Sequence, residues 1–377
     1  MQSPEVNAAA ETECHYDIVI VGGGLVGATL ALALSRYAFW RVALVEKNAF
    51  APDETDQVLH PSFDARNTAL SNGTCELFEQ LNLWAQLKPL SEAIHTIDVS
   101  DQGGFGHVSI DASEERVAAL GYVIENRFMG QALLQGLRVS ERVTVFAPAE
   151  FSRPKAVAGG FTGIVTHAGQ ALQVRTGLLV VADGADSPCC LQLGIGVSRQ
   201  AYGQQGIVTA LVADRAHAGR AWERFTPQGP LAILPQTEGR LGLTWCVNDD
   251  DAHRLMQLSD IAFLAELQRV SADLAGQFQR VGRRYAYPLR LVLAEEQIRP
   301  HLVVLGNAAH GLHPVAGQGL NMALRDVVVL VRVLVDAARN GESLGNFQTL
   351  QRYLAERGPD QFSTIQFSDK LTRLFSN

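Results

Sequence analysis

The 377-residue sequence predicts an α/β protein in which a Rossmann-like nucleotide-binding domain carries an inserted domain with an antiparallel sheet. Three observations predict this fold. An apolar strand, a glycine loop and a helix follow one another near the N-terminus, a second apolar strand in mid-chain ends in acid and glycine, and a third runs into a glycine-rich loop and a helix from about Leu320. Between the second and third strands the pattern changes to short antiparallel strands.

The first unit matches the dinucleotide-binding pattern GxGxxG. Gly22 permits the tight turn after the strand, Gly24 lets a pyrophosphate approach the backbone, and Gly27 lets the helix pack close to the strand. Glu46 ends the second strand, 19 residues beyond Gly27, where it can accept hydrogen bonds from an adenosine ribose. The motif predicts a dinucleotide but does not separate NAD from FAD. The two strands and the helix between them are expected at 17–21, 41–45 and 28–37.

Three polar residues farther along are candidate ligand contacts with simpler alternatives. Arg66 lies between a loop and a helix-like segment, and its alternative is a solvated surface arginine. Gln131 lies in a helix expected at 127–137, where a polar helix face is the alternative. Asp183 follows the apolar strand 178–182, at the carboxyl end where ligands bind in open α/β sheets, although it would equally cap a turn.

The third unit is the stretch around which the rest of the chain is organised. The apolar strand 302–305 breaks at Gly306 into a loop, and the helix from about Leu320 follows Gly317 and Gly319. A helix start is electropositive and has unpaired N–H donors, so this loop suits an anionic or electron-accepting ring.

The inserted region differs in pattern from the nucleotide-binding units. The apolar run 229–235 includes Pro230 and Pro235, which suits a sheet edge or a pocket wall. Antiparallel strands are expected at 207–212, 221–225 and 241–247, followed by helical structure over 249–279.

Composition and charge exclude several classes of protein. The net charge of −8 gives no nucleic-acid footprint, and the apolar run 327–335 is interrupted by Arg332 and is too short to span a membrane. The first 13 residues lack the basic start and apolar centre of a signal peptide. The five cysteines form no ligand spacing, so we expect reduced cytosolic thiols and no metal site. These cysteines are Cys14, Cys75, Cys189, Cys190 and Cys246.

Taken in order, these features resemble the FAD-dependent aromatic hydroxylases, the flavoprotein monooxygenases of the para-hydroxybenzoate hydroxylase type. The resemblance covers nearly the whole chain and includes the Asp183-Gly184 motif. Within this group the chain resembles the ubiquinone-biosynthesis hydroxylases, and most closely the branch acting on 2-polyprenyl-6-methoxyphenol. Most relatives carry Gly-Asp where this chain has Gly306-Asn307, and the neutral Asn307 fits that branch. The segments that carry the resemblance are 65–71, 223–226 with 229–232, and 306–309 with 312–319.

The resemblance implies a role for each candidate residue around FAD. Asp183 would lie near both FAD and the incoming nicotinamide cofactor, and Pro314 would belong to the environment of the flavin ring. The other implied contacts are the pyrophosphate for Gly22, Gly24 and Gly27, the ribose for Glu46, the pyrophosphate or ribityl region for Arg66 and Gln131, the ribityl chain for Asn307 beside Gly306, and the pyrimidine edge of the flavin for Gly317, Gln318 and Gly319.

The implied reaction is an aromatic hydroxylation that consumes O₂. NADH or NADPH reduces FAD, the reduced flavin reacts with O₂ to give a C4a-hydroperoxide, and an electron-rich phenol attacks its distal oxygen. This chemistry needs no triad and no metal, and we assign no residue as acid or base. His310 and His313 are three apart and would be ligands or a base in one interpretation, but we favour packing or hydrogen bonding beside the flavin.

A polyprenyl phenol predicts an apolar pocket with a mouth toward a bilayer. The partners that this implies are the lipophilic substrate, a membrane surface and other ubiquinone-biosynthesis proteins, and the implied location is cytoplasmic, peripheral on the inner face of the membrane. The expected pocket residues are Leu231, Ile233, Leu234, Trp245, His313 and Pro314.

Other interpretations of the function stay open. They are a hydroxylase of another ring position, a non-hydroxylating flavin reductase of the same fold, an NAD-dependent dehydrogenase and a non-catalytic flavin-binding scaffold. A halogenase is disfavoured because its WxWxIP motif is missing.

The domain boundaries follow from the same assignments. The FAD-binding domain is expected at 14–98, 126–198 and 289–345, the substrate domain at 99–125 and 199–288, a C-terminal helical segment at 346–377 and a disordered tail at 1–13.

Overall fold

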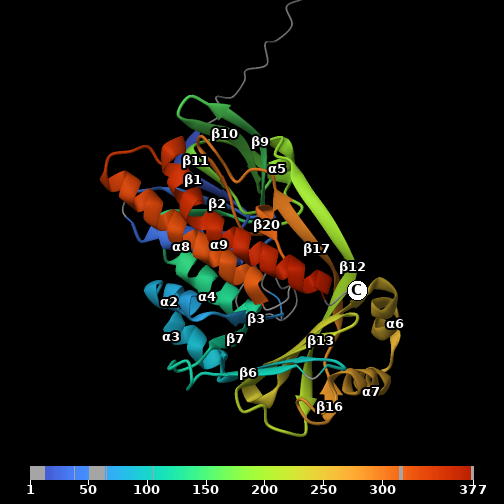
Figure 1. Cartoon of the computed structure of the whole chain (residues 1–377). Coiled ribbons are helices and arrows are strands. Elements are labelled where there is room, and N and C mark those ends of the chain that lie inside the picture. Colours follow the sequence, from blue (N-terminus) through green and yellow to red (C-terminus); the bar gives the residue numbers. More distant parts are fainter. Residues whose placement is uncertain are drawn as a thin grey trace, which may run out of the picture.

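The computed structural model describes residues 13–37, 39–50, 64, 66–104, 106–313 and 317–374. Within these ranges the chain forms three sheets and a set of helices that cover them (Figure 1). The helices are α1 (Leu25–Ser35), α2 (Asn72–Gln80), α3 (Trp84–Leu87), α4 (Asn126–Arg138), α5 (Pro188–Gln192), α6 (Asp249–Gln257), α7 (Asp260–Ser271), α8 (Gln318–Arg339) and α9 (Phe347–Leu374), with 3₁₀ turns η1 (Lys88–Leu90), η2 (Thr237–Gly239) and η3 (Gly306–Ala308).

The first sheet has eight strands, and its central part is parallel. Strands β19, β11, β1, β2 and β8 lie in that order and pair in parallel, as the Rossmann-like prediction requires. The last four residues of β1 are buried, which fits a strand covered on both faces. Its strands are β1 (Cys14–Val21), β2 (Val42–Val45), β8 (Val143–Phe146), β9 (Ala149–Val157), β10 (Gly160–His167), β11 (Gln170–Val181), β18 (Ile298–Arg299) and β19 (Leu302–Val304).

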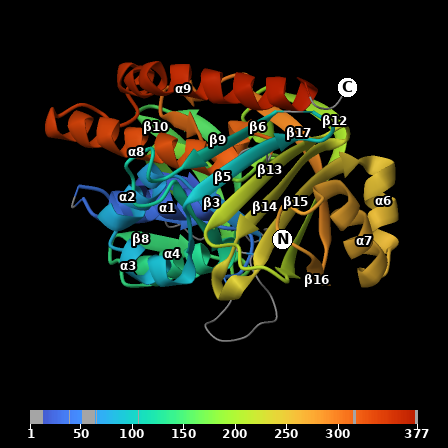
Figure 2. The ribbon, with the colours of Figure 1, turned by 60° about the horizontal axis from the view of Figure 1, so that its bottom comes forward.

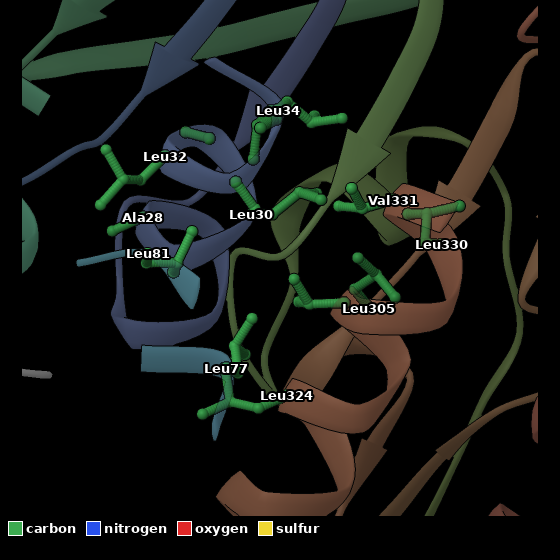
Figure 3. Close-up of a cluster of buried hydrophobic side chains, with 14 of the residues drawn as sticks. Ala28, Leu30, Leu32, Leu34, Leu77, Leu81, Leu305, Leu324, Leu330 and Val331 are labelled. Carbon is green, nitrogen blue, oxygen red and sulfur yellow. The ribbon is translucent and has the colours of Figure 1, made fainter. Parts of the chain in front are cut away.

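Helices α1 and α8 share the main core against one face of this sheet. Leu30 of α1 is fully buried, and Leu324 and Leu330 of α8 belong to the same apolar cluster. Figure 3 shows these side chains approaching one another from the two helices, with Leu77 of α2 beside them. Helix α1, which follows the first glycine loop, therefore packs against helix α8, which follows the second.

The second sheet has nine strands and is antiparallel except where β13 pairs with β5. It lies beside the first sheet, with α6 and α7 on its outer side (Figure 2). The fold class predicted from sequence, an α/β domain with an antiparallel sheet, is confirmed. Its strands are β5 (Thr96–Asp101), β6 (His107–Asp111), β12 (Val197–Ala213), β13 (Arg220–Thr226), β14 (Gly229–Pro235), β15 (Leu241–Asn248), β16 (Phe278–Val281), β17 (Tyr285–Ala294) and β20 (His310–Gly311).

A third, small sheet joins the two larger units. It consists of β3 (Asn67–Leu70), β7 (Gly121–Glu125) and β4 (Glu92–Ile94). β7 therefore pairs here and not in the nine-stranded sheet, while β5 runs across the expected boundary at residues 98 and 99. The domain boundaries proposed from sequence stay a prediction.

The two longest helices end the chain and lie side by side across the molecule (Figure 1). α9 occupies most of the segment that was expected to be helical from residue 346. Among the described helices, none combines the length and the apolarity that crossing a bilayer requires. The tail predicted at residues 1–13 lies outside the described residues except for Glu13.

Candidate functional site

Four of the sequence motifs meet at one edge of the parallel sheet. Val21 at the end of β1 pairs with Val45 of β2 and with Val181 of β11. Val181 in turn pairs with Val304 of β19. Because these parallel strands end at the same level, the residues that follow them are brought together. The motifs joined in this way are the loop from Gly22, Glu46, Asp183 and the loop from Gly306.

The first glycine loop is crowded by backbone. Gly22 has a φ of +106°, and a Cβ there would lie 2.3 Å from the carbonyl oxygen of Ala182. A Cβ on Gly27 would lie 1.9 Å from the carbonyl oxygen of Gly22, so α1 can pack this closely only on glycine. Gly24 is the N-cap of α1 and has no side chain to accept from the N–H groups of the first turn. Those N–H groups suit an anionic ligand.

Glu46 is buried behind this loop and braces it. One carboxylate oxygen accepts a hydrogen bond from the N–H of Gly23 at 2.7 Å, and the other accepts from both the backbone and the side-chain amide of Asn48 at 2.8 Å. The side chain is 5% exposed. The acidic residue thus lies where the sequence pattern predicted it, and it also fixes the loop directly.

Asp183 combines the two interpretations that the sequence left open. Its Oδ2 accepts a hydrogen bond from the N–H of Cys189 at 3.1 Å, so one oxygen caps the first turn of α5. Its Oδ1 is buried and has no hydrogen-bond partner among the described residues. Burial raises the pKa of this carboxyl above its usual value, although a hydrogen bond from Ser187 opposes the shift. An orphaned buried oxygen at the sheet edge suits a ligand donor.

The second glycine loop packs against the start of α1. Gly306 has a φ of +60°, and a Cβ there would lie 3.3 Å from the side chain of Val26 in the first turn of α1. Asn307, the next residue, is exposed within η3. Gly317 is the left-handed N-cap of α8 with a φ of +59°. Among the described residues, no atom lies within 4 Å of a Cβ built on Gly319 in the first turn of α8. Gln318, between these glycines, is partly buried.

Asn321 was missed by the sequence analysis and holds the start of α8 in place. Its Oδ1 accepts from the N–H of Ser71 at 2.9 Å and from the hydroxyl of Thr74 at 2.8 Å. Its Nδ2 donates to the carbonyl oxygens of Ala69 at 2.8 Å and Gly317 at 3.0 Å. All of its hydrogen-bonding capacity is therefore used to join β3 and α2 to the second loop. An Asn in the first turn of a helix that follows glycines is the signal that would have found it.

Arg66 and Gln131 are the two candidates with the least support from geometry. Arg66 donates to the carboxylate of Asp64 at 2.6 Å, and its guanidinium lies 5.8 Å from the centre of the Tyr287 ring. Its side chain is 40% exposed at the edge of the site. Gln131 is exposed on α4. Their proposed contacts with the ligand stay predictions.

The two histidines of the second loop are both buried, but in different surroundings. His310 Nε2 lies 2.7 Å from Asp326 Oδ2. His313 Nε2 lies 3.4 Å from Gln204 Oε1, and its ring meets the Tyr202 ring edge-on. Burial lowers the pKa of His313 to about 4, so this side chain is neutral at physiological pH. No cluster of three metal-binding side chains occurs within the described ranges.

Three of the expected pocket residues belong instead to the core of the nine-stranded sheet. Leu231, Ile233 and Trp245 are buried in a cluster with α6 and α7, and the Trp245 ring lies 5.9 Å from the Phe263 ring of α7. Because side chains alternate along a strand, these residues face the helices and not the opposite side. The prediction for them is corrected: they support the sheet. Leu234 lies on the opposite face of the sheet from these three residues. Pro314 lies outside the described residues.

The opposite side of that sheet, which we call the inner face, includes several small residues. Gly206 pairs with Cys246, and Thr244 pairs with Ala232. Ala232 and Thr244 are partly exposed, whereas their neighbours on the helix side are buried. Farther along this face, a Cβ on Gly242 would lie 2.7 Å from the Asn67 side chain of β3. The Tyr287 ring would lie 3.2 Å from a Cβ on Gly206 and so covers this glycine, whereas Ala232 and Thr244 stay partly exposed.

The comparisons with known proteins define the class. The chain matches the family described as an FAD binding domain over residues 15–368. The fold is that of a probable FAD-dependent monooxygenase from Pseudomonas aeruginosa, with a TM-score of 0.79, 22% identity, and coverage of 96% of this chain and 97% of that one. The family and the fold therefore define a flavoprotein with an FAD binding domain.

The chain belongs to the FAD binding domain family, and its cofactor is FAD. A ubiquinone hydroxylase from Rhodospirillum rubrum is 38% identical over 363 residues, which is 96% of this chain and 82% of the relative. The 3-demethoxyubiquinol 3-hydroxylase of Escherichia coli is 32% identical over 376 residues, or 96% of this chain and 90% of the relative. The resemblance drawn from the motifs, to hydroxylases of ubiquinone biosynthesis, is confirmed at this level.

Proposed function

We propose that this protein hydroxylates the aromatic ring of a polyprenyl phenol in ubiquinone biosynthesis, and that its substrate is 2-polyprenyl-6-methoxyphenol, converted to the 1,4-benzoquinol. The observation that carries the proposal is the 38% identity to a ubiquinone hydroxylase over 96% of the chain. The reaction consumes the phenol, O₂, NAD(P)H and a proton, and releases the hydroxylated ring, water and NAD(P)⁺. One oxygen atom enters the ring and the other leaves as water.

The residues at the sheet edge fit FAD. The first turn of α1 provides N–H groups for the pyrophosphate, and Glu46 lies behind the preceding loop for the adenosine ribose. The orphaned Oδ1 of Asp183 supplies a buried acceptor between the two loops. No atom of the described residues lies within 4 Å of a Cβ on Gly319, where we propose that the ring approaches the first turn of α8. Asn307, whose side chain is exposed, is proposed for the ribityl chain.

Bound FAD supplies the two-electron chemistry and the activation of O₂, while the protein supplies position and electrostatics. The N-terminal turn of α8 would offer its N–H groups and its positive dipole end to the pyrimidine edge of the ring, where they would stabilise negative charge. We assign Gly317, Gln318 and Gly319 to this contact. Asn321 holds the turn in register with β3, so the donors are positioned before the ligand arrives.

We place the phenol ring over the inner face of the nine-stranded sheet. Ala232 and Thr244 are small and partly exposed on this face, and Leu234 lies on the same side as an apolar wall. His313 lies nearby beside Gln204 and stays neutral because burial holds its pKa at about 4. With so low a pKa the ring is a weak base, so we assign it a hydrogen bond beside the substrate and not the role of general base.

A second candidate differs only in the ring carbon that is hydroxylated. The 32% identity to a 3-demethoxyubiquinol 3-hydroxylase over 96% of this chain favours it. The two candidates use the same cofactor site, and they differ in how the substituted ring is oriented above the inner face.

Deleting the protein from its host and identifying the accumulated intermediate separates the candidates. Accumulation of 2-polyprenyl-6-methoxyphenol is the expected result, and re-expression of the protein removes it. Accumulation of the demethoxyquinone would assign the second candidate. Unchanged ubiquinone with no accumulated precursor would contradict both.

The lipophilic substrate implies delivery from a membrane. We propose that the protein works on the inner face of the cytoplasmic membrane, where a polyprenyl tail stays in the bilayer while the ring enters the site. Flotation with vesicles tests this: vesicles containing the polyprenyl phenol should carry the protein upward. Protein that stays at the bottom of the gradient both with and without the vesicles would contradict this proposal.

A further inference from the structure

A fully buried carboxylate links the second glycine loop to the C-terminal helix. Asp326 of α8 is 0% exposed, and its Oδ2 lies 2.7 Å from Nε2 of His310, which is 1% exposed. Its Oδ1 accepts hydrogen bonds from Arg357 Nε at 2.6 Å and from Gln361 Nε2 at 3.0 Å. The two oxygens therefore divide between the loop on one side and α9 on the other.

The position of the His310–Asp326 pair in the chain indicates its role. His310 lies on β20, four residues after Gly306 in the second loop, and Asn321 lies just after the loop, in the first turn of α8. Asp326 holds the first of these positions, and Asn321 holds the second. The segment between the two clamps contains Gly317 and Gly319, the residues proposed to contact the flavin ring.

Asp326 is surrounded by a cationic partner and hydrogen-bond donors. Burial opposes the charge on Arg357, but the carboxylates of Asp326 and Asp360 outweigh it and hold the pKa of the guanidinium above its usual value. Asp360 also pairs with Arg325, so two acids and two bases alternate between α8 and α9. A buried carboxylate is tolerated when it is paired and hydrogen-bonded in this way.

The pair also fixes the protonation of His310. An ionised carboxylate accepts only, so the Nε2 of His310 carries a hydrogen and donates to Asp326. The other ring nitrogen, Nδ1, is buried with no hydrogen-bond partner among the described residues. The imidazole is thus held in one tautomer and one orientation from the side of α8.

We propose that Asp326 is a positioning residue that sets the second loop for flavin binding through His310, and that α9, through Arg357 and Gln361, is part of the same device. This rests on the proposed role of the second loop at the flavin ring. It predicts that loosening the pair weakens FAD binding even where the fold is intact.

Binding of FAD to the apoprotein, with the visible spectrum and the melting temperature, tests the proposal without turnover. His310→Ala should weaken FAD binding by about ten- to hundredfold, because it leaves a buried carboxylate oxygen without its donor. His310→Gln can donate to Asp326 and should restore binding to within about threefold. Asp326→Asn should weaken binding and shift the flavin absorption bands. The matched control is Arg332→Gln, which breaks an exposed α8–α9 ion pair with Glu356.

The outcomes separate positioning from mere stability. If His310→Ala and Asp326→Asn melt earlier yet bind FAD with wild-type affinity and spectrum, the proposal is overturned and the pair is only a structural support. If Arg332→Gln weakens FAD binding as much as they do, it is also overturned. If Asp326→Asn does not fold, the His310 variants carry the test. Failure of the proposed function would instead show as wild-type protein that binds FAD but does not hydroxylate the phenol.

Discussion

The two glycine loops open helices in similar ways, but they need glycine for different reasons. At the first loop the protein itself fills the space: a Cβ on Gly22 or Gly27 would lie 2.3 or 1.9 Å from a backbone oxygen. At the second loop, no atom of the described residues lies within 4 Å of a Cβ on Gly319. Gly22 and Gly27 are therefore required by the fold, whereas packing among the described residues does not require Gly319, which we propose faces the ligand. A glycine motif alone does not separate these cases.

The largest effect is expected from Gly27→Ala. The added methyl group would collide with the carbonyl oxygen of Gly22, and backbone cannot move aside as a flexible side chain can. We expect a loss of more than about 4 kcal/mol in unfolding free energy, or no folded protein. Gly73→Ala in α2, where nothing lies within 4 Å of the Cβ, is the control and should fold normally. Chemical denaturation of both variants measures the difference, and equal stability would remove the contrast between crowded and open glycines.

A smaller effect, confined to acid pH, is expected from His313 at the second loop. Its pKa is about 4 in the folded protein and near 6.5 when unfolded, so the unfolded state binds more protons between these values. Stability therefore falls as the pH falls from about 6.5 to about 4, by up to about 3 kcal/mol from this group. His313→Gln, which can still donate to Gln204, should flatten the profile in that window. Urea unfolding at several pH values tests this, and an unchanged slope would show that His313 does not titrate as described.

The smallest effect is expected from Gly317→Ala. The φ of +59° is left-handed, but the nearest atom to a Cβ would be 3.7 Å away, so only conformational strain opposes the change. We expect a loss of about 1 kcal/mol, and less for Gly317→Asn, since Asn tolerates this region. Differential scanning calorimetry of the apoproteins measures it. A loss as large as that of Gly27→Ala would mean that the second loop is as crowded as the first.

The sequence was most informative where contacts are local. The first unit is a strand, turn, helix and strand within about 30 residues, so the spacing from Gly22 to Glu46 was enough to predict it. The meeting of Asp183 and Gly306 at the same edge also follows from a general rule about parallel strands. Both predictions needed only strand ends and the direction of the sheet.

The remainder depended on contacts that a single sequence does not contain. Asn321 bonds to Ser71 across a separation of 250 residues. Similarly, the run 229–235 is apolar on both faces, so its pattern did not show that Leu231 and Ile233 face the helices while Leu234 faces the other way. The side chains that fill the core are those on the face that α6 and α7 cover, and the sequence of the strand itself does not show which face that is.

The central claim is that the first loop holds the adenosine end of FAD and the second holds its ring. The most direct test titrates apoprotein with FAD and with riboflavin, which lacks the pyrophosphate and adenosine. Gly319→Ala should weaken both ligands about tenfold or more, because the added methyl group occupies space needed by the ring. Glu46→Gln should weaken FAD by about tenfold and leave riboflavin unchanged. If Gly319→Ala weakened FAD alone, or Glu46→Gln weakened both ligands equally, this assignment of the two loops would be wrong.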